Sequence, residues 1–313
     1  MNKRIDPLDI VAKAKTAVPL YSSILKERAE RSLVEFIRQA WHVLEPGAPY
    51  VHGWHIDFLA AHLEAITDGV EINRRPYNRL LINIPPGMLK SMLVNVFWPA
   101  WEWGPRNMPH LRYICAAHKV ENLSARESRK MRDLILSACY QARWGDRVSL
   151  AKDQNEKLNF QNKAKGFRIA TAITSLTGIR GDRVIIDDPH STDSANSEVQ
   201  RETEVQTFLE AIPTRLNNPK QSAIVVIMQR LHQQDVSGVI LEKQLGYDHV
   251  MLPMEYDPTR NYPTMLGFED PRQEDGELLF PERFDAAVVE RDKKVLGPFA
   301  VAGQFQQEPA PRG

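Results

Sequence analysis

Lys90 and Ser91 follow an apolar run and a turn rich in proline and glycine, in the sequence RLLINIPPGMLKS at residues 79–91. A strand, a tight turn and a helix start in this order present backbone N–H groups to phosphates, and the partial positive charge of the helix start adds to the attraction. We therefore predict that Lys90 reaches the terminal phosphates of a nucleoside triphosphate and that Ser91 gives its hydroxyl to Mg²⁺. The same prediction places four loop residues around the phosphates: Pro86, Gly87, Met88 and Leu89.

This loop departs from the usual pattern G-x-x-x-x-G-K-[ST]. Ile84 and Leu89 stand where that pattern has glycine, and Gly87 is the only glycine of the loop. Glycine is usual at these positions because the backbone crowds the phosphates and φ can be positive. The alternative interpretation is an ordinary strand–turn–helix junction with an exposed lysine, and the existence of a second half of the site argues against it.

The second half is the sequence RVIIDDPHS at residues 183–191, an apolar strand that ends in two carboxylates. Asp187 lies at the carboxyl end of this strand, where α/β folds place ligand chemistry, and we predict that it binds Mg²⁺ directly or through water. Asp188 is predicted to orient or deprotonate the attacking water. The alternative is a turn in which aspartate simply favours the bend before Pro189.

Two further segments end in polar residues that suit phosphate chemistry. The sequence VIMQRLH at residues 226–232 brings Gln229 near the γ-phosphate if its strand lies between the other two, although an ordinary strand end is equally compatible. The loop TGIRGDR at residues 177–183 presents Arg180, whose guanidinium suits the charge of a phosphoryl transition state. A solvated turn arginine is the alternative.

Trp54 and His55 belong to the segment HGWH at residues 52–55. Its two histidines have a spacing seen in metal sites, but no further ligand cluster supports a metal there. A helix start with a packed aromatic residue is the simpler interpretation. An aromatic and histidine segment before the phosphate strand is also suited to contact an adenine ring.

Strands and helices alternate along the middle of the chain, and this alternation decides where these residues meet. Before it, apolar residues recur at helical spacing over residues 21–43 and 54–66. Parallel-type strands are predicted at residues 80–84, 111–116, 183–187, 222–228 and 249–252, and a hairpin at residues 157–161 and 166–172. Helices are predicted from Lys90 to a limit at Pro99, and over residues 121–136, 197–211 and 235–245. Short apolar strands separated by helices indicate an α/β fold with a parallel-rich central sheet covered on both faces.

Charge and composition restrict the classes of protein to which the chain can belong. Among its 313 residues, 40 Lys and Arg balance 40 Asp and Glu, whereas a nucleic-acid-binding domain usually has an excess of positive charge. DNA would therefore be contacted through a local patch or a partner. Cys115 and Cys139 are the only cysteines, so no disulfide or zinc framework is expected. The lack of an 18-residue apolar run or a signal peptide predicts a soluble intracellular protein.

Six segments, in this order, resemble the large subunit of tailed-bacteriophage terminases: INIPPGMLKS, RVIIDDPHS, IMQRLH, LPMEY, GELLFPERF and AGQFQQEPAPRG. The resemblance runs from about Trp54 to the C-terminus. In that family a P-loop, RecA-like (additional-strand) ATPase domain precedes an RNase H-like nuclease. The resemblance implies that the family's ATPase motifs fall on Lys90, Ser91, Asp187, Asp188 and the Gln229 strand end. It also implies a role for Arg180, which matches an arginine that acts on a neighbouring subunit's ATP in some members. Leu89 in place of glycine and Asp188 in place of the commoner glutamate depart from the family pattern.

The resemblance further implies an activity and partners. We expect hydrolysis of ATP with Mg²⁺ to drive double-stranded DNA into a viral procapsid, in the cytoplasm of the infected bacterial host. The expected assembly is a homo-oligomeric ring that meets a portal protein and a terminase small subunit, and the chain alone is expected to be largely monomeric, with no membrane involved. Two alternatives stay open, a helicase-like DNA-dependent motor ATPase and a nucleotide-binding scaffold that does not hydrolyse ATP.

The expected domain organisation has three parts. Residues 1–70 form a helical region packed on the ATPase core, and residues 71–254 form that core. Residues 255–313 are rich in proline, glycine and charge and are predicted to form a strap or linker toward a nuclease domain. Since no nuclease domain is expected in this chain, nuclease activity is not expected either.

Overall fold

The structure is a computed structural model that describes residues 20–119, 124–156, 158–176 and 178–310. At its centre, these residues form an eight-stranded sheet with the order β10-β3-β9-β8-β4-β7-β6-β5. Neighbouring strands from β10 to β7 pair in parallel, and β6 and β5 are antiparallel. The strands are β3 (Arg79–Asn83), β4 (Tyr113–Ala117), β5 (Leu150–Asn155), β6 (Asn159–Asn162), β7 (Phe167–Ala172), β8 (Arg183–Asp187), β9 (Ala223–Met228) and β10 (Asp248–Met251). A separate ribbon joins β1 (Glu71–Ile72) and β2 (Arg75–Pro76).

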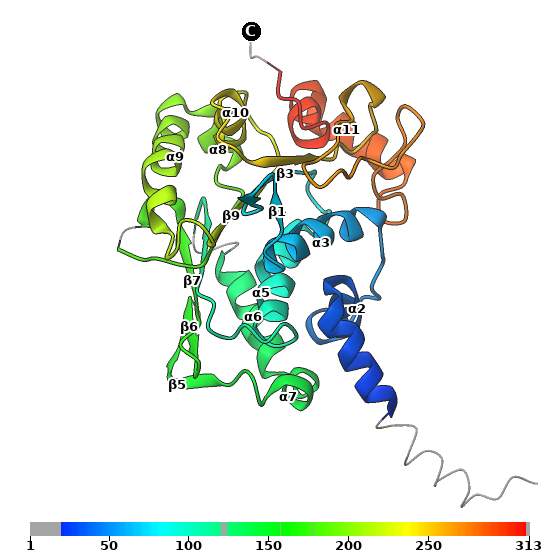
Figure 1. Cartoon of the computed structure of the whole chain (residues 1–313). Coiled ribbons are helices and arrows are strands. Elements are labelled where there is room, and N and C mark those ends of the chain that lie inside the picture. Colours follow the sequence, from blue (N-terminus) through cyan, green and yellow to red (C-terminus); the bar gives the residue numbers. More distant parts are fainter. Residues whose placement is uncertain (1–19, 120–123, 157, 177, 311–313) are drawn as a thin grey trace, which may run out of the picture.

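Helices cover both faces of the sheet (Figure 1). One face carries α2 (Leu33–Leu44), α3 (Trp54–Thr67), α4 (Lys90–Met92), the π-helical turn η1 (Leu93–Phe97), α5 (Trp98–Trp103), α6 (Ala125–Leu136) and α7 (Ala138–Trp144). The other carries α9 (Glu198–Ala211), the 3₁₀ turn η4 (Ile212–Arg215) and α10 (Val236–Glu242), with α8 (Thr192–Asn196) before α9. The C-terminal part contains α11 (Ala286–Ala300) and the π-helical turn η6 (Val301–Phe305). Short 3₁₀ turns are η3 (Ile173–Ser175) and η5 (Pro258–Arg260).

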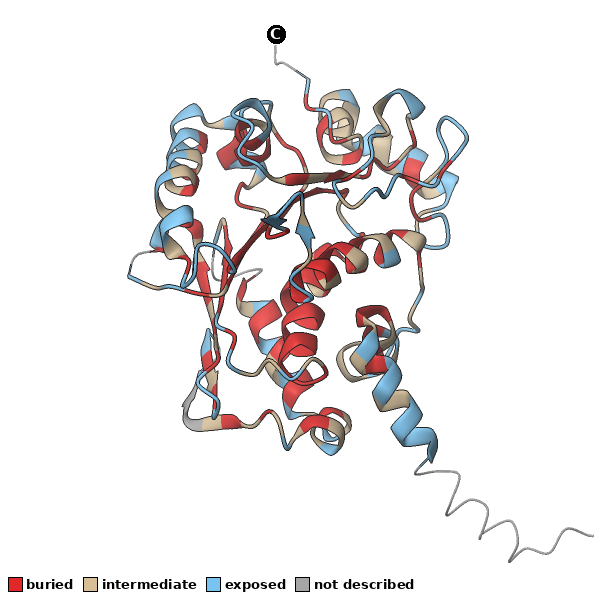
Figure 2. Ribbon diagram, viewed as in Figure 1, coloured by how far each residue is buried: buried red, intermediate tan, exposed pale blue. Residues whose placement is uncertain are grey.

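The central strands contribute side chains to two separate cores. On β3, Leu80 and Ile82 belong to the larger core under α3, η1 and α5, whereas Leu81 belongs to the core under α9 and α10. All are fully buried, and burial is concentrated along the same strands in Figure 2. Because side chains alternate across a strand, a continuous apolar run such as that of β3 fits a position covered on both sides. The predicted α/β fold with a mostly parallel sheet is therefore confirmed.

Most predicted strands and helices are present, but the helix after Lys90 does not end at Pro99. It passes through η1 and continues as α5 to Trp103. Pro99 lies in the first turn of α5, where its missing N–H costs little. The helical path from Lys90 to Trp103 therefore places a run of buried aromatic side chains under the sheet, including Trp98, Trp101 and Trp103.

Three other segments differ from the prediction. The helical pattern of residues 21–43 is broken at Ser32, whose side chain accepts a hydrogen bond from the Glu35 backbone N–H and caps α2. Strand β5 extends the predicted hairpin, with which it pairs. The C-terminal segment contains a helix that was not predicted, α11, which begins after the cap Asp285 and is kinked at Gly297. Gly297 and Pro298 interrupt the sequence pattern and hide this helix.

Some predicted features lie outside the described residues. They are the first nineteen residues of the predicted helical region, residues 121–123 of the predicted helix at 121–136, Lys157 of the hairpin, Thr177 of the arginine loop and the last three residues of the strap. Within the part that the structure describes, no helix combines the length and apolar character that a membrane span requires.

Candidate functional site

The loop between β3 and α4 contains two residues in the left-handed backbone conformation. Gly87 has φ of 82° and Leu89 has φ of 60°. A left-handed conformation at a residue with a Cβ costs on the order of 1–3 kcal/mol. This cost explains why the usual phosphate-loop pattern has glycine at the position that Leu89 occupies here. Leu89 adopts that conformation directly before Lys90, so the helix start keeps its place.

Gly87 lies close to Phe284, a residue almost two hundred positions further along the chain. A Cβ at this position would lie 2.5 Å from Cζ of Phe284. The C-terminal segment therefore packs directly on the loop, and Phe284 is a loop neighbour that sequence reasoning did not identify. The only sequence signal for it was the segment GELLFPERF, which contains this phenylalanine.

The three strands that carry the predicted site lie side by side in the order β3, β9, β8. In register, Asn83 of β3 pairs with Met228 of β9, and Ile227 pairs with Asp187 of β8. Their carboxyl ends therefore meet at one edge, as the sequence interpretation of the Gln229 strand required. At this edge Lys90, Asp188 and Gln229 come together.

Asp188 is the centre of this group. Lys90 Nζ lies 2.8 Å from its Oδ1, and the Gln229 backbone N–H donates to the same oxygen at 3.1 Å. The exposed lysine of the alternative interpretation is not found, because Lys90 is only 6% exposed. The backbone of Asp188 has φ of 42° and is tied to both flanking strands, since its N–H donates to Ile227 and its carbonyl accepts from His118 N.

Asp187 points into the protein beneath the loop and is 2% exposed. The pKa of this carboxyl is raised to about 7, mainly by burial and also by the neighbouring Asp188, while Lys90 and the Ser91 hydroxyl oppose the rise. Oδ2 accepts a hydrogen bond from Asn95 Nδ2, whereas Oδ1 has no hydrogen-bond partner among the described residues. A buried acidic oxygen without a partner is suited to a proton or a cation.

The donor set fits Mg²⁺ bound together with phosphates rather than a cage made by protein alone. Ser91 and Asp187 are hard oxygen donors on neighbouring elements, as Mg²⁺ prefers. Among residues 20–310, leaving out the undescribed gaps, no group of three or more His, Cys, Asp or Glu side chains forms a metal cage. Protein sites for Mg²⁺ commonly use one or two protein ligands and complete the shell with phosphate oxygens and water.

Arg180 does not join this group within the chain. It is exposed and precedes the amino end of β8, whereas Asp187 is the last residue of that strand. The two therefore lie at opposite ends of β8. This position excludes a contact of Arg180 with its own chain's Lys90 loop but leaves it accessible to another molecule.

Trp54 and His55 begin α3, on which Trp54 is half-buried and His55 is fully buried. The His55 ring packs on Phe280 with centroids 4.7 Å apart. Burial lowers the pKa of His55 to about 4, so the ring is neutral. In this arrangement His55 packs between the C-terminal segment and the core instead of facing solvent, and the predicted adenine contact stays a prediction.

Two histidines that the site prediction did not include bond to α9, His190 from the loop after Asp188 and His118 from the end of β4. Glu204 of α9 bonds with His190 Nδ1 on one oxygen and with His118 Nδ1 at 2.6 Å on the other. Burial raises the pKa of Glu204, but the hydrogen bonds with His190 and His118 outweigh this effect, so the pKa is lowered overall. His190 Nε2 in turn accepts from the backbone N–H of Val236 at the start of α10.

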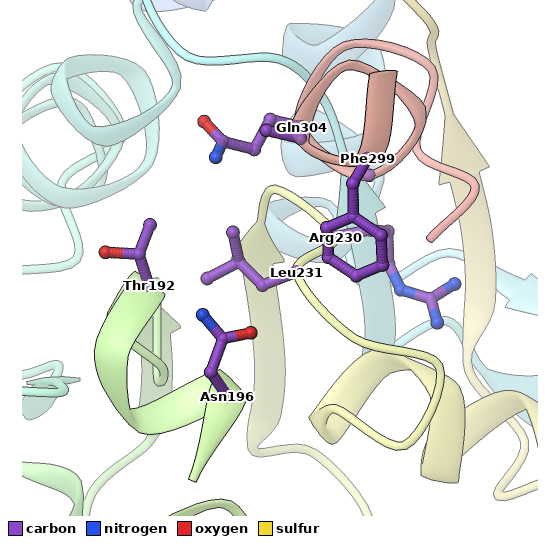
Figure 3. Close-up of a pocket in the computed structure, with 8 residues that line it drawn as sticks. Thr192, Asn196, Arg230, Leu231, Phe299 and Gln304 are labelled. Atoms are coloured by element: carbon purple, nitrogen blue, oxygen red, sulfur yellow. The ribbon is translucent and has the colours of Figure 1, made fainter. Parts of the chain in front are cut away.

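A cavity of about 150 Å³ lies next to Arg230 and Leu231, between α8 and the C-terminal helical segment (Figure 3). Its lining consists of Thr192, Asn196, Arg230, Leu231, Phe299, Ala300, Gly303 and Gln304. The Arg230 guanidinium turns away from the Phe299 ring and pairs with Asp235 at 3.0 Å. Small-molecule sites usually measure roughly 300–1,000 Å³, so this cavity is too small to be the nucleotide site.

Comparison with known proteins identifies the fold. No family model matches the chain, and no curated protein matches its sequence. Among solved structures, the large terminase of bacteriophage HK97 is similar with a TM-score of 0.54 and 11% identity, over 88% of this chain and 54% of that one. The large terminase ATPase domain of Thermus phage P74-26 gives a TM-score of 0.48 and 13% identity, over 86% and 97% of the two chains.

The chain thus spans about half the length of the HK97 structure, 54%. The P74-26 similarity is too weak to add to the argument. This chain has the α/β, RecA-like fold of bacteriophage large terminases.

Proposed function

We propose that this chain is the ATPase part of a viral genome-packaging motor, which couples ATP hydrolysis to the movement of double-stranded DNA into a procapsid. One observation carries the proposal. Lys90 and Ser91 at a helix start, and Asp187 and Asp188 at a strand end, meet at the edge formed by β3, β9 and β8. The fold shared with the HK97 large terminase supports the choice of this motor class.

The residues of the site divide the work. When nucleotide binds, the ammonium of Lys90 leaves Asp188 and pairs with the terminal phosphates. The phosphates then replace the Asp188 carboxylate as its negatively charged partner. Asp188, then free of its ion pair, accepts a hydrogen bond from the attacking water and holds it in line. Gln229 lies beside this position, and its Oε1 is buried without a hydrogen-bond partner among the described residues, so it can accept a hydrogen bond from the same water.

Ser91 and Asp187 would hold Mg²⁺, which neutralises charge on the phosphates when bound. Arg180 of a neighbouring subunit would reach the same phosphates, since it cannot reach those of its own chain. This requires a ring of subunits, and a portal protein and terminase small subunit are the partners proposed for that ring. The exposed surface around Arg180 is the part of the chain that would contribute to the neighbouring site.

Phosphate release measured with and without double-stranded DNA tests the proposal. Mg²⁺-dependent hydrolysis that DNA or the portal stimulates, and that Lys90→Ala abolishes, is the expected result. Duplex unwinding without a portal would favour a helicase-like motor. Tight nucleotide binding without hydrolysis under every condition would favour a nucleotide-binding scaffold.

A further inference from the structure

Asn95 makes a direct hydrogen bond to the predicted magnesium ligand. Its Nδ2 donates to Oδ2 of Asp187 at 2.8 Å, and both side chains are buried. Asn95 stands four residues after Ser91 on the same helical path. Residues at this spacing share a face of a helix, so the path that presents Ser91 to the site also presents Asn95 to β8.

The backbone around Asn95 is unusual for a reason that the sequence contains. Asn95 lies in the π-helical turn η1, and the residue four positions later is Pro99. Proline has no N–H, so the α-helical partner of the Asn95 carbonyl is missing. Arg168 of β7 supplies a donor instead, because its Nη2 lies 3.1 Å from that carbonyl. Turns of this type occur frequently at functional sites.

Burying Arg168 only to donate one hydrogen bond to the Asn95 carbonyl would be costly. Its side chain is 0% exposed, and Nε and Nη1 have no hydrogen-bond partner among the described residues. A guanidinium stays charged in proteins, and a buried charge requires compensation. The carboxylates of Asp187 and Glu127 lie in the same buried region, since they and Arg168 all affect the pKa of the Cys115 thiol. Arg168 therefore fixes the Asn95 backbone and balances the charge beneath the site.

The result is a carboxylate that is fixed by one oxygen and open at the other. Asn95 holds Oδ2 of Asp187, and Oδ1 has no partner within the described residues. We propose that Asn95 is a positioning residue for the divalent cation of the nucleotide site, and that Arg168 holds Asn95 in place. Asn95 fixes the rotation of the Asp187 carboxylate and leaves Oδ1 available to a cation. This inference rests on the proposed nucleotide site.

A purely structural role for Asn95 predicts a different outcome. Loss of a buried hydrogen bond alone lowers the stability of the fold and leaves the Mg²⁺ requirement of nucleotide binding unchanged. Loss of a residue that orients a metal-binding carboxylate typically weakens metal affinity about 10- to 100-fold. The two roles are therefore separated by a titration of Mg²⁺, without any measurement of turnover.

The test measures binding of a fluorescent ATP analogue by the full chain across a range of Mg²⁺ concentrations, together with binding in EDTA. Asn95→Leu keeps the branched shape of the side chain, with a larger volume, and removes the donor. It should raise the Mg²⁺ midpoint about tenfold or more while binding in EDTA stays within about twofold of the parent. Asn162→Leu is the matched control, because Asn162 is equally buried but bonds to Pro109 and Gly166 instead.

Asn162→Leu should lower thermal stability and keep the parent Mg²⁺ midpoint. If Asn95→Leu does not fold, Asn95→Ser replaces it, since its hydroxyl is too short to reach Asp187 and the same shift is expected. If a folded Asn95 variant has the same Mg²⁺ midpoint as the parent, the positioning role is wrong, and the proposed nucleotide site is unaffected. A parent chain that binds no nucleotide at any Mg²⁺ concentration overturns the proposed function and this inference with it.

Discussion

The ammonium of Lys90 lies 2.8 Å from Oδ1 of Asp188, so the residue predicted to bind phosphate is paired with the residue predicted to orient water. Both side chains are largely shielded from solvent, at 8% and 16% exposure. In this arrangement neither group is available for its predicted task. A phosphate that attracts Lys90 would at the same time release Asp188, which couples binding of the nucleotide to preparation of the water.

Lys90→Ala should abolish hydrolysis, because it removes the charge that binds the terminal phosphates. It should also lower the free energy of unfolding by roughly 1–3 kcal/mol, since the partly buried Asp188 loses a charged partner. Lys90→Met is the control, because it keeps most of the apolar stem without the ammonium. Phosphate release and urea unfolding measure the two effects. Hydrolysis at the parent rate in either variant would show that the site is assigned to the wrong lysine.

Asp188→Asn should keep nucleotide binding and reduce turnover by roughly 10²-fold or more, the scale of a lost general base. Asparagine is chosen because it tolerates the positive φ of 42° at this position better than most residues. Asp188→Ala should add a loss of stability that the asparagine variant avoids. Isothermal titration with a nucleotide analogue and single-turnover hydrolysis separate binding from chemistry. Equal loss of nucleotide affinity in Asp187→Ala and Asp188→Asn would contradict different roles for the two carboxylates.

Asp187 should make the metal-free protein less stable as the pH rises. Its pKa is about 7 in the fold against 3.8 for the ordinary carboxyl, mainly because of burial. Between these two values the folded state retains a proton that the unfolded state has lost, so the folded state becomes relatively less favourable up to about pH 7. Asp187→Asn removes this effect. As the pH rises from 4 to 8 in EDTA, the free energy of unfolding of the variant should increase by roughly 1–4 kcal/mol relative to that of the parent.

Urea unfolding at both pH values, with and without Mg²⁺ and nucleotide, measures this difference. The ligands should restore the stability of the parent at pH 8 and leave the Asp187→Asn variant unchanged. A stability difference between the two proteins that is the same at pH 4 and pH 8 would mean that Asp187 is ionised throughout.

Arg180→Ala should leave nucleotide binding by the single chain unchanged and silence the assembled motor. Arg180 is exposed at the end of β8 opposite to Asp187, so it can serve only a neighbour's site. An arginine finger contributes about 10³-fold or more to turnover. Mixing Arg180→Ala with Lys90→Ala should restore part of the activity, because a subunit with intact Lys90 then meets an intact Arg180. An Arg180→Ala motor that packages DNA at the parent rate would eliminate this residue, and Arg183 and Arg215 would be tested next.

Arg183 is already engaged in the core, which makes it the weaker of these two replacements. Its Nη2 lies 2.7 Å from Glu102 Oε1 and its side chain is 6% exposed. Arg215 of η4 is half-buried, bonds locally to Thr214 and lies next to Gly181, whose N–H donates to its carbonyl. If Arg180 is excluded, Arg215 is therefore the residue that a small movement of the loop could present to a neighbour.

The sequence by itself determined the parts of the site that lie on one element at a time. The apolar runs before Asn83, Asp187 and Met228 indicate buried strands because side chains on both faces must be apolar. The turn before Lys90 and the carboxylates at the end of β8 are local patterns, and both were located from their neighbours in the sequence. Leu89 shows the limit of that approach, since a pattern that requires glycine fails although the backbone keeps the conformation.

Only the tertiary structure decided which side chains meet across elements. Asn95 and Asp187 are separated by 92 positions and Lys90 and Asp188 by 98, and no local pattern records a hydrogen bond between them. The packing of Phe284 on Gly87 depends in the same way on a distant segment of the chain. The fold also buries Lys90, and burial raises the pKa of Asp187. These properties arise when the sheet excludes water from groups that lie far apart in the sequence, so composition and spacing alone cannot predict them.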